Sequence, residues 1–343
     1  MGRSPGRAPV PVRRALTARV PVTVVGGYLG AGKTTLVNHL LRNAGGLRIA
    51  VLVNDFGALP IDADLIEAQG DDLISIAGGC VCCAYGNDLM AALMALPQRA
   101  LPPQHVLVET SGVALPGAVA RSIKLIAGFD IDSVAVLADA ETVRARAADR
   151  YMGDTIERQL AEADLVLLNK TDLVSPEQLE ELRTWLRHES PGARLIEAVR
   201  AQVPPELLFG RGQTRSPRPA AGMFAAGAIR PMDDAATRYE SASFTEERPV
   251  DVRSLADELA RPELGLIRAK GVLRDLDGSL KALHLVGARR EVTPYALARD
   301  AHQGLACIGL AGRIDRAAIE RALARAAAAA DATVAPTGAV IPG

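Results

Sequence analysis

Glycine, lysine and threonine recur near the start of the chain at the spacing of a phosphate-binding loop. Residues 27–34 read G-Y-L-G-A-G-K-T, which matches the pattern G-x-x-x-x-G-K-[ST]. The apolar run Val20–Val25 precedes the loop and predicts a buried strand, and Leu36–Arg42 follows it and predicts the first turns of a helix. In that context backbone N–H groups and the helix N-terminus are expected to hold phosphate oxygens. The alternative is a glycine-rich turn without a ligand.

The side chains of this loop predict distinct contacts with a nucleotide. We expect Lys33 to lie against the β- and γ-phosphates and the Thr34 hydroxyl to bind magnesium. The predicted nucleotide-binding residues of the loop are Gly27, Gly30, Ala31, Gly32, Lys33, Thr34 and Thr35.

A carboxylate at the end of a second predicted strand extends the magnesium site. The apolar residues Val106–Val108 lead to Glu109, and Gly112 follows three residues later. Ligands of open α/β sheets gather at the carboxyl ends of the strands. We therefore expect Glu109 to hold magnesium, directly or through a water, and the N–H of Gly112 to reach the γ-phosphate.

A third element predicts which base is bound. The buried strand Leu165–Leu168 runs into Asn169, Lys170, Thr171 and Asp172. The Asp172 carboxylate can accept two hydrogen bonds from N1–H and the exocyclic amine of guanine, a donor pair that adenine lacks. Asn169 is expected to bond the far edge of the base, and the stem of Lys170 to cover its face. This element lies about 135 residues after the phosphate loop, and the combination predicts GTP rather than ATP.

Three of the four cysteines fall within four residues, at Cys80, Cys82 and Cys83. Disulfides at such short spacing would be strained, and neighbouring thiolates repel one another unless a cation holds them. Soft sulfur ligands suit zinc, copper(I) or cobalt(II). Redox chemistry and three buried small residues are the alternatives. The isolated Cys307 lies in an apolar run and is expected in the core.

Composition and charge exclude several classes of partner. The chain has 343 residues, 49% hydrophobic and 23% charged, and can bury large cores in about two domains. Its net charge of -1 and aromatic content of 3% argue against nucleic acid and acidic membranes. No apolar run approaches the length of a membrane-spanning helix. Five arginines and no acid before Val20 predict a disordered basic leader rather than an export signal, and hence a cytoplasmic protein.

Alternating strands and helices predict an α/β fold in the first part of the chain. A mostly parallel sheet covered on both faces, as in a P-loop NTPase domain, accounts for the pattern. Strands are predicted at Val20–Val25, Arg48–Val53, Leu73–Ile76, His105–Glu109, Ser133–Ala138 and Leu165–Leu168.

The rest of the chain predicts a smaller α+β domain. Its expected strands and helices are Ser241–Glu246, Val252–Arg261, Leu266–Arg274, Ser279–Val286, Leu305–Leu310 and Asp315–Ala329. The predicted organisation is a leader at 1–19, a P-loop GTPase domain at 20–203, a Pro-, Gly-, Ala- and Arg-rich linker at 204–240, the α+β domain at 241–328 and a disordered tail at 329–343.

The ordered motifs GGYLGAGKTT, NDFGALPID, GGCVCC, VLVETSG and NKTD resemble those of the CobW-type metallochaperone GTPases. The resemblance spans about residues 20–328 and is looser in the second domain, where R-A-K-G at 268–271 and the strand-rich 281–292 carry it. It implies linked metal and GTP binding, with hydrolysis driving metal release to a client. It also implies roles for particular residues: Cys80, Cys82 and Cys83 as metal ligands, Glu109 as the strand-end glutamate, and Asn169, Lys170 and Asp172 as the guanine motif.

The chain departs from that family in the segment that follows the second predicted strand. Asp55 replaces a frequent glutamate and Ala58 removes another, which puts any metal role of the lost side chain in doubt. Asp62 matches the family's aspartate and is our candidate contact to the γ-phosphate, a turn residue being the alternative. No histidine lies between His188 and His284, which weakens the case for metal storage. His39 is expected to be packed or solvated rather than a ligand.

Together these features predict a GTP-hydrolysing metallochaperone with GTP and Mg²⁺ as cofactors. It would bind zinc or cobalt and deliver it to a client metalloprotein, with Lys33, Thr34, Glu109 and Asp62 as the catalytic residues. No water-orienting glutamine is identified, so slow intrinsic turnover, stimulated by metal or client, is expected. The alternatives are a metal-responsive GTP-dependent binding module and an activator dedicated to one metalloenzyme, of the nitrile hydratase or cobalamin-pathway type. The sequence leaves a homodimer open.

Overall fold

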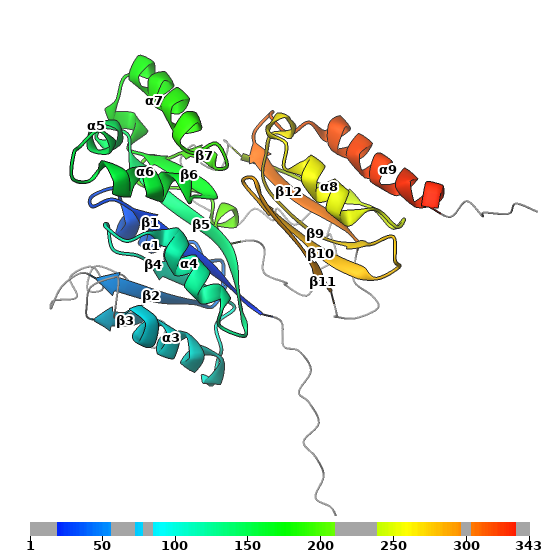
Figure 1. The fold of residues 1–343 in the computed structure, drawn as a ribbon, viewed down its shortest axis with the longest axis horizontal. Helices are drawn as coiled ribbons and strands as arrows, with labels where there is room; N and C mark the ends of the chain where they lie inside the picture. Colours follow the sequence, from blue (N-terminus) through cyan, green and yellow to red (C-terminus); the bar gives the residue numbers. More distant parts are fainter. Residues whose placement is uncertain (1–18, 56–72, 78–84, 210–238, 296–302, 334–343) are drawn as a thin grey trace, which may run out of the picture.

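The structure is a computed structural model, and it describes residues 19–55, 73–77, 85–209, 239–295 and 303–333. In these residues the chain forms two β-sheets, each with its own helices (Figure 1). Among the described residues no helix is both long and apolar enough to cross a membrane.

The first sheet has seven parallel strands in the order β3-β2-β4-β1-β5-β6-β7. Because parallel strands need crossover connections, helices lie between most of them and cover both faces. The strands are β1 (Val20–Gly27), β2 (Ile49–Asp55), β3 (Leu73–Ala77), β4 (His105–Glu109), β5 (Phe129–Asp139), β6 (Leu165–Asn169) and β7 (Arg194–Glu197). The helices are α1 (Lys33–Arg42), α3 (Tyr85–Ala95), α4 (Pro116–Lys124), α5 (Val143–Ala147), α6 (Gly153–Ala161) and α7 (Pro176–Glu189).

The alternation of side chains along β5 shows how the two faces are filled. Ala135 and Leu137 face the core that contains α1, whereas Val136 and Ala138 face the core built by α5, α6 and α7. The helices α3 and α4 extend this second face toward β2 and β4. The predicted α/β class is therefore confirmed, with every strand of the sheet parallel.

The second sheet has five antiparallel strands in the order β11-β10-β9-β12-β8. Two helices, α8 and α9, cover one face and bury a leucine- and alanine-rich core against it (Figure 1). The elements are β8 (Tyr239–Thr245), α8 (Val252–Leu259), β9 (Leu266–Arg274), β10 (Leu280–Val286), β11 (Arg289–Pro294), β12 (Gly304–Leu310) and α9 (Arg316–Thr333). Cys307 is 0% exposed in this core, as the sequence predicts.

The two sheets meet at the amino ends of the strands of the first sheet. Arg194, the first residue of β7, donates from Nε to Leu266 O at 2.8 Å and from Nη2 to Ala260 O at 3.0 Å. Arg289 of β11 pairs through Nε with Oδ1 of Asp164 at 3.0 Å, just before β6. The second domain therefore contacts the end of the first sheet where its strands begin, and the phosphate loop lies at the opposite end, where the strands finish.

Two β-bulges lie at this contact. Between β1 and β5, Val22 pairs with Ile131 and Thr23 with Ser133, so that Asp132 is the extra residue. Between β12 and β9, Ile308 pairs with Arg268 and Gly309 with Leu266, so that one residue of β9 is also extra. Bulges re-aim side chains, and here they lie beside an ion pair between the two domains.

Asp132 accepts hydrogen bonds from two cations of β9. Arg268 Nη2 donates to its Oδ1, and so does Lys270 Nζ at 2.8 Å. The side chains of Asp132 and Arg268 are only 1% and 2% exposed. Burial alone would raise the pKa of Asp132, but the charges of Arg268 and Lys270 outweigh it and hold that pKa well below its usual range.

A segment that the sequence places in the linker is packed into the first domain. Leu207 and Leu208 are 0% exposed and Phe209 is 4% exposed. Thr23 Oγ1 donates to Leu208 O at 2.8 Å, and His105 Nε2 lies 2.9 Å from the same hydroxyl. The composition of 204–240 conceals this anchor, because its three consecutive large apolar residues are diluted by the Pro- and Gly-rich stretch that follows.

Candidate nucleotide and magnesium site

The phosphate loop begins at the end of β1 and ends at the start of α1 with glycines whose positions exclude a larger residue. Gly27 has φ +125°, and a Cβ there would lie 2.4 Å from Leu137 O. Gly32 has φ +106°, and a Cβ there would lie 2.6 Å from Nδ2 of Asn169. The loop therefore passes close to β5 and to the residue that ends β6, and this approach requires glycine.

The predicted catalytic lysine and one predicted magnesium ligand lie at the start of α1, and the second predicted ligand ends β4. Lys33 is the first residue of that helix and is 8% exposed, and Thr34 Oγ1 donates to Oε1 of Glu109 at 3.2 Å. Glu109 is the last residue of β4 and is 2% exposed. A hydroxyl and a carboxylate side by side supply hard oxygen ligands, so these residues fit magnesium. Thr35, next along the helix, is exposed.

The loop that follows Glu109 is held against the phosphate loop. Thr110 N donates to Val25 O at 2.9 Å, which continues the β1–β4 ladder past the end of β4. At Gly112 a Cβ would lie 2.8 Å from the backbone N of Leu29. Gly112 therefore lies directly beside the phosphate loop.

The guanine-type segment is tied to the phosphate loop through Asn169. Its Nδ2 donates to Ala31 O at 2.9 Å, and its Oδ1 accepts from Ala201 N at 2.7 Å. The sequence assigns this side chain to the base. In the structure it joins the phosphate loop and the loop after β7 to the end of β6.

Lys170 and Asp172 flank the place predicted for the base. Lys170 has φ 62° and its Nζ pairs with Oδ2 of Asp139, the last residue of β5, at 2.6 Å. Asp172 lies in a short 3-10 helix, Thr171–Leu173, and is exposed. Its carboxylate is thus accessible to a base.

Two residues near this place have no sequence signal. Arg200 and Ala201 follow β7 with φ of 51° and 54°, a conformation that costs roughly 1–3 kcal/mol for residues other than glycine. The loop that contains them contacts the guanine-type segment, since Thr171 N and Oγ1 both donate to Ala198 O at 3.3 Å. Arginine and alanine do not mark left-handed backbone, so the sequence interpretation missed this loop.

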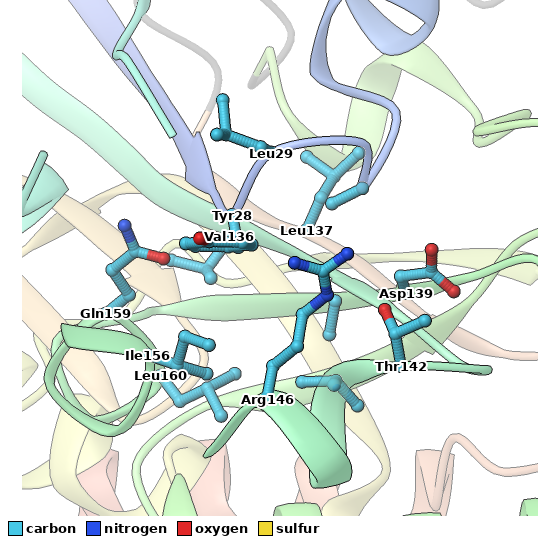
Figure 2. Close-up of a pocket in the computed structure, with 13 residues that line it drawn as sticks. Tyr28, Leu29, Val136, Leu137, Asp139, Thr142, Arg146, Ile156, Gln159 and Leu160 are labelled. Atoms are coloured by element: carbon cyan, nitrogen blue, oxygen red, sulfur yellow. The ribbon is translucent and has the colours of Figure 1, made fainter. Parts of the chain in front are cut away.

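A small cavity lies behind the phosphate loop, between β5 and the helices α5 and α6 (Figure 2). The Tyr28 ring forms part of its wall, with the guanidinium carbon of Arg146 4.8 Å from the ring centroid. The hydroxyl of Tyr28 donates to the sulfur of Met152, just before α6. The back of the loop is therefore packed against α5 and the start of α6.

Other predicted site residues lie outside the described residues. They are Asp62 and the cysteines Cys80, Cys82 and Cys83. Among the described residues no group of three or more His, Cys, Asp or Glu side chains forms a metal-binding cluster. His39 is buried, and its Nε2 lies 2.8 Å from Val203 O, so this histidine is packed within the described structure.

Comparison with known proteins decides the family. The model of the CobW/HypB/UreG nucleotide-binding domain matches residues 21–197, and that of the cobalamin synthesis protein cobW C-terminal domain matches residues 239–327. This chain belongs to the CobW/HypB/UreG family. The resemblance drawn from the ordered motifs is confirmed.

Relatives within this family are named for zinc. The chain is 34% identical over 234 residues to a zinc chaperone CobW of a Sinorhizobium species, covering 58% of this chain and 64% of that protein. It is 35% identical over 226 residues to the zinc chaperone CobW of Pseudomonas aeruginosa, covering 56% of this chain and 60% of that one. The matches thus span less than two thirds of these relatives. The zinc-bound YjiA GTPase of Escherichia coli is similar over 90% of this chain and 99% of that chain, at 22% identity and a TM-score of 0.43.

Proposed function

We propose that this CobW/HypB/UreG-family chain hydrolyses GTP and uses hydrolysis to deliver a transition metal to a client metalloprotein. The observation that carries the nucleotide part is the hydrogen bond from Asn169 Nδ2 to Ala31 O. This bond joins the guanine-type segment to the phosphate loop at the carboxyl ends of the strands, where a single nucleotide can contact both. The proposed GTPase domain is 20–203 and the proposed α+β domain is 241–328.

The residues of this edge divide the work of phosphoryl transfer between them. Backbone N–H groups of residues 27–34 hold the phosphates, and Lys33 neutralises charge on the β- and γ-phosphates as water attacks. Thr34 and Glu109 would hold Mg²⁺, which supplies further charge neutralisation when bound. Gly112 donates its N–H to the γ-phosphate, and Asp62 is proposed to contact the same group. Asp172 and Lys170 select and cover guanine.

The metal is treated as cargo rather than as a resident cofactor. We propose Cys80, Cys82 and Cys83 as its ligands, because three thiolates at this spacing suit zinc or cobalt. The names of the relatives support zinc. A free thiolate site requires a reducing compartment, so the proposal places the protein in the cytoplasm.

GTP hydrolysis by the metal-stripped full chain, titrated with Zn²⁺ and Co²⁺, tests this proposal. It is measured beside the triple variant Cys80→Ser, Cys82→Ser, Cys83→Ser, with Cys307→Ala as the matched control because that cysteine is buried in the second domain. We expect one equivalent of metal to stimulate hydrolysis in wild type and in Cys307→Ala, but not in the triple variant.

Each other outcome has a definite meaning. If metal leaves the rate of GTP hydrolysis unchanged in all three proteins, metal binding and hydrolysis are not coupled. The protein would then be a GTPase with a separate cysteine site. Absence of GTP binding in wild type would refute the nucleotide assignment itself. Metal-stimulated hydrolysis without transfer of metal to an apo-metalloprotein would instead favour the binding-module alternative.

A further inference from the structure

Gln159 of α6 is a buried amide whose donors are directed at the loop that follows β4. Its side chain is 1% exposed. Its Nε2 donates to Gly112 O at 3.0 Å and to Ala114 O at 2.7 Å. An amide nitrogen carries two hydrogens, so both are used on carbonyls of this one loop.

The bond to Gly112 O fixes the orientation of the Gly112–Val113 peptide, which directly follows the Gly112 N–H that is proposed to reach the γ-phosphate. In a trans peptide the N–H points opposite to the C=O. Because Gly112 O points at α6, the N–H of Val113 in the same peptide points away from that helix. Gly112 itself lies against Leu29, where a Cβ would come within 2.8 Å of Leu29 N. Rotation of the Gly112–Val113 peptide would therefore break a buried bond to Gln159.

A second contact from the same helix region holds the far end of this loop. Oε2 of Glu162 accepts from Gly117 N at 3.2 Å, and its Oε1 pairs with Arg121 at 3.1 Å. The loop from Gly112 to the start of α4 is thus held at both ends by residues of α6 or the residue that follows it. Figure 2 shows that Gln159 also lines the cavity behind the phosphate loop, close to Tyr28.

We propose that Gln159 is a positioning residue for the γ-phosphate: through Gly112 O and Ala114 O it holds the loop after β4 in the orientation that binds GTP. It acts through the loop and does not touch the reacting atoms. The inference rests on the proposed GTPase function. It goes further by predicting that Gln159 affects the affinity for GTP more than the affinity for GDP. The reason is that the Gly112 loop would contact only the γ-phosphate, which GDP lacks.

The test compares the affinities of GDP and of a non-hydrolysable GTP analogue in the full chain with Mg²⁺, using a fluorescent nucleotide. Gln159→Met keeps the length of the side chain and removes both donors. Gln159→Glu keeps its shape and places an acceptor where Nε2 donates. Ile156→Val is the matched control, because Ile156 is buried on the same helix and lines the same cavity.

We expect both Gln159 variants to bind the GTP analogue about tenfold more weakly, with the affinity for GDP changed less than twofold. The kcat for GTP should fall about tenfold in the same variants, and Ile156→Val should match wild type in every measurement. A merely structural role would weaken both nucleotides together.

Four results would overturn the inference. An equal loss of GDP and GTP affinity would make Gln159 a general stability residue. Unchanged affinities in Gln159→Glu would overturn it even if Gln159→Met failed to fold. If wild type binds GDP and the GTP analogue and hydrolyses GTP, and both Gln159 variants match it in affinity and in kcat, the role of Gln159 is refuted. The proposed function would then remain intact. Failure of wild type to bind either nucleotide would refute both.

Discussion

Removing the Asp132 carboxylate should strongly destabilise the contact between the two domains. In Asp132→Asn the Arg268 guanidinium, 2% exposed, and the Lys270 ammonium would lose their common countercharge. Breaking a buried ion pair by removing one partner costs about 3–5 kcal/mol, because the remaining charge stays buried. We expect a loss near the lower end, about 3 kcal/mol, because Lys270 is 19% exposed and can turn toward solvent.

Asp130 provides a matched control two residues earlier in the same strand. It pairs with Arg19 at 2.7 Å, but the side chains are 45% and 59% exposed. Exposed pairs contribute about 0–1 kcal/mol, so Asp130→Asn should change the free energy of unfolding by less than about 1 kcal/mol. Urea unfolding followed by the fluorescence of Trp185, the single tryptophan, measures both variants in the first domain.

A double variant separates the ion pair from other effects of substitution. In Asp132→Asn with Arg268→Met the two buried charges of the pair are removed and only Lys270, which can turn toward solvent, keeps its charge. We therefore expect a loss smaller than the sum of the single losses by about 2 kcal/mol. Additive losses, or an Asp132→Asn no more destabilised than Asp130→Asn, would refute the reasoning. The pH dependence provides a second check. Because the folded pKa of Asp132 is lowered, the stability it contributes is present above the ordinary carboxyl pKa and is lost as pH falls toward the lowered value.

Two further outcomes follow from single side chains. Asp172→Asn should lower GTP affinity at least about a hundredfold and favour xanthosine triphosphate, because an amide can donate to the xanthine carbonyl where guanine carries an amine; competition against a fluorescent guanine nucleotide measures this, and retained guanine preference would contradict the base assignment. Cys307 is 0% exposed, and burial raises its pKa to about 12. In the Cys80→Ser, Cys82→Ser, Cys83→Ser chain we therefore expect no thiol to react with an aromatic disulfide at pH 8 until urea is added, whereas reaction in the folded state would place Cys307 at the surface.

The residues that could be predicted from sequence are those whose chemistry requires a fixed local spacing. The loop residues Gly27, Gly32, Lys33 and Thr34 lie within eight positions of one another. The strand that leads into them and the helix that follows place apolar residues on their buried faces. Glu109 and Asn169 end buried strands, so the rule that ligands gather at carboxyl ends places them near the phosphate loop. The contact of Thr34 with Glu109 agrees with that prediction.

The residues that were missed act through tertiary contacts without a local signature. Gln159 is an ordinary helical residue until the loop after β4 is placed beside it. Asp132 lies just before the predicted strand Ser133–Ala138, and its role depends on a one-residue bulge that composition does not reveal. The strand β7 is only four residues long, and two of them, Arg194 and Glu197, are charged, which conceals it from pattern analysis.

The docking of the second domain at the amino ends of the strands has a consequence for communication within the molecule. From Asp132 at the domain contact to Asp139 beside Lys170, β5 advances seven residues, or about 23 Å at 3.3 Å per residue. A partner bound to the described part of the second domain could therefore respond to a bound nucleotide only through the elements that lie between the domain contact and the nucleotide site. One such element is α6: Met152, just before it, contacts Tyr28 of the phosphate loop, and Asp164, just after it, pairs with Arg289 of β11. A rigid tilt of this one short helix would change the contact with Tyr28 at one end of the sheet and the contact with Arg289 at the other end.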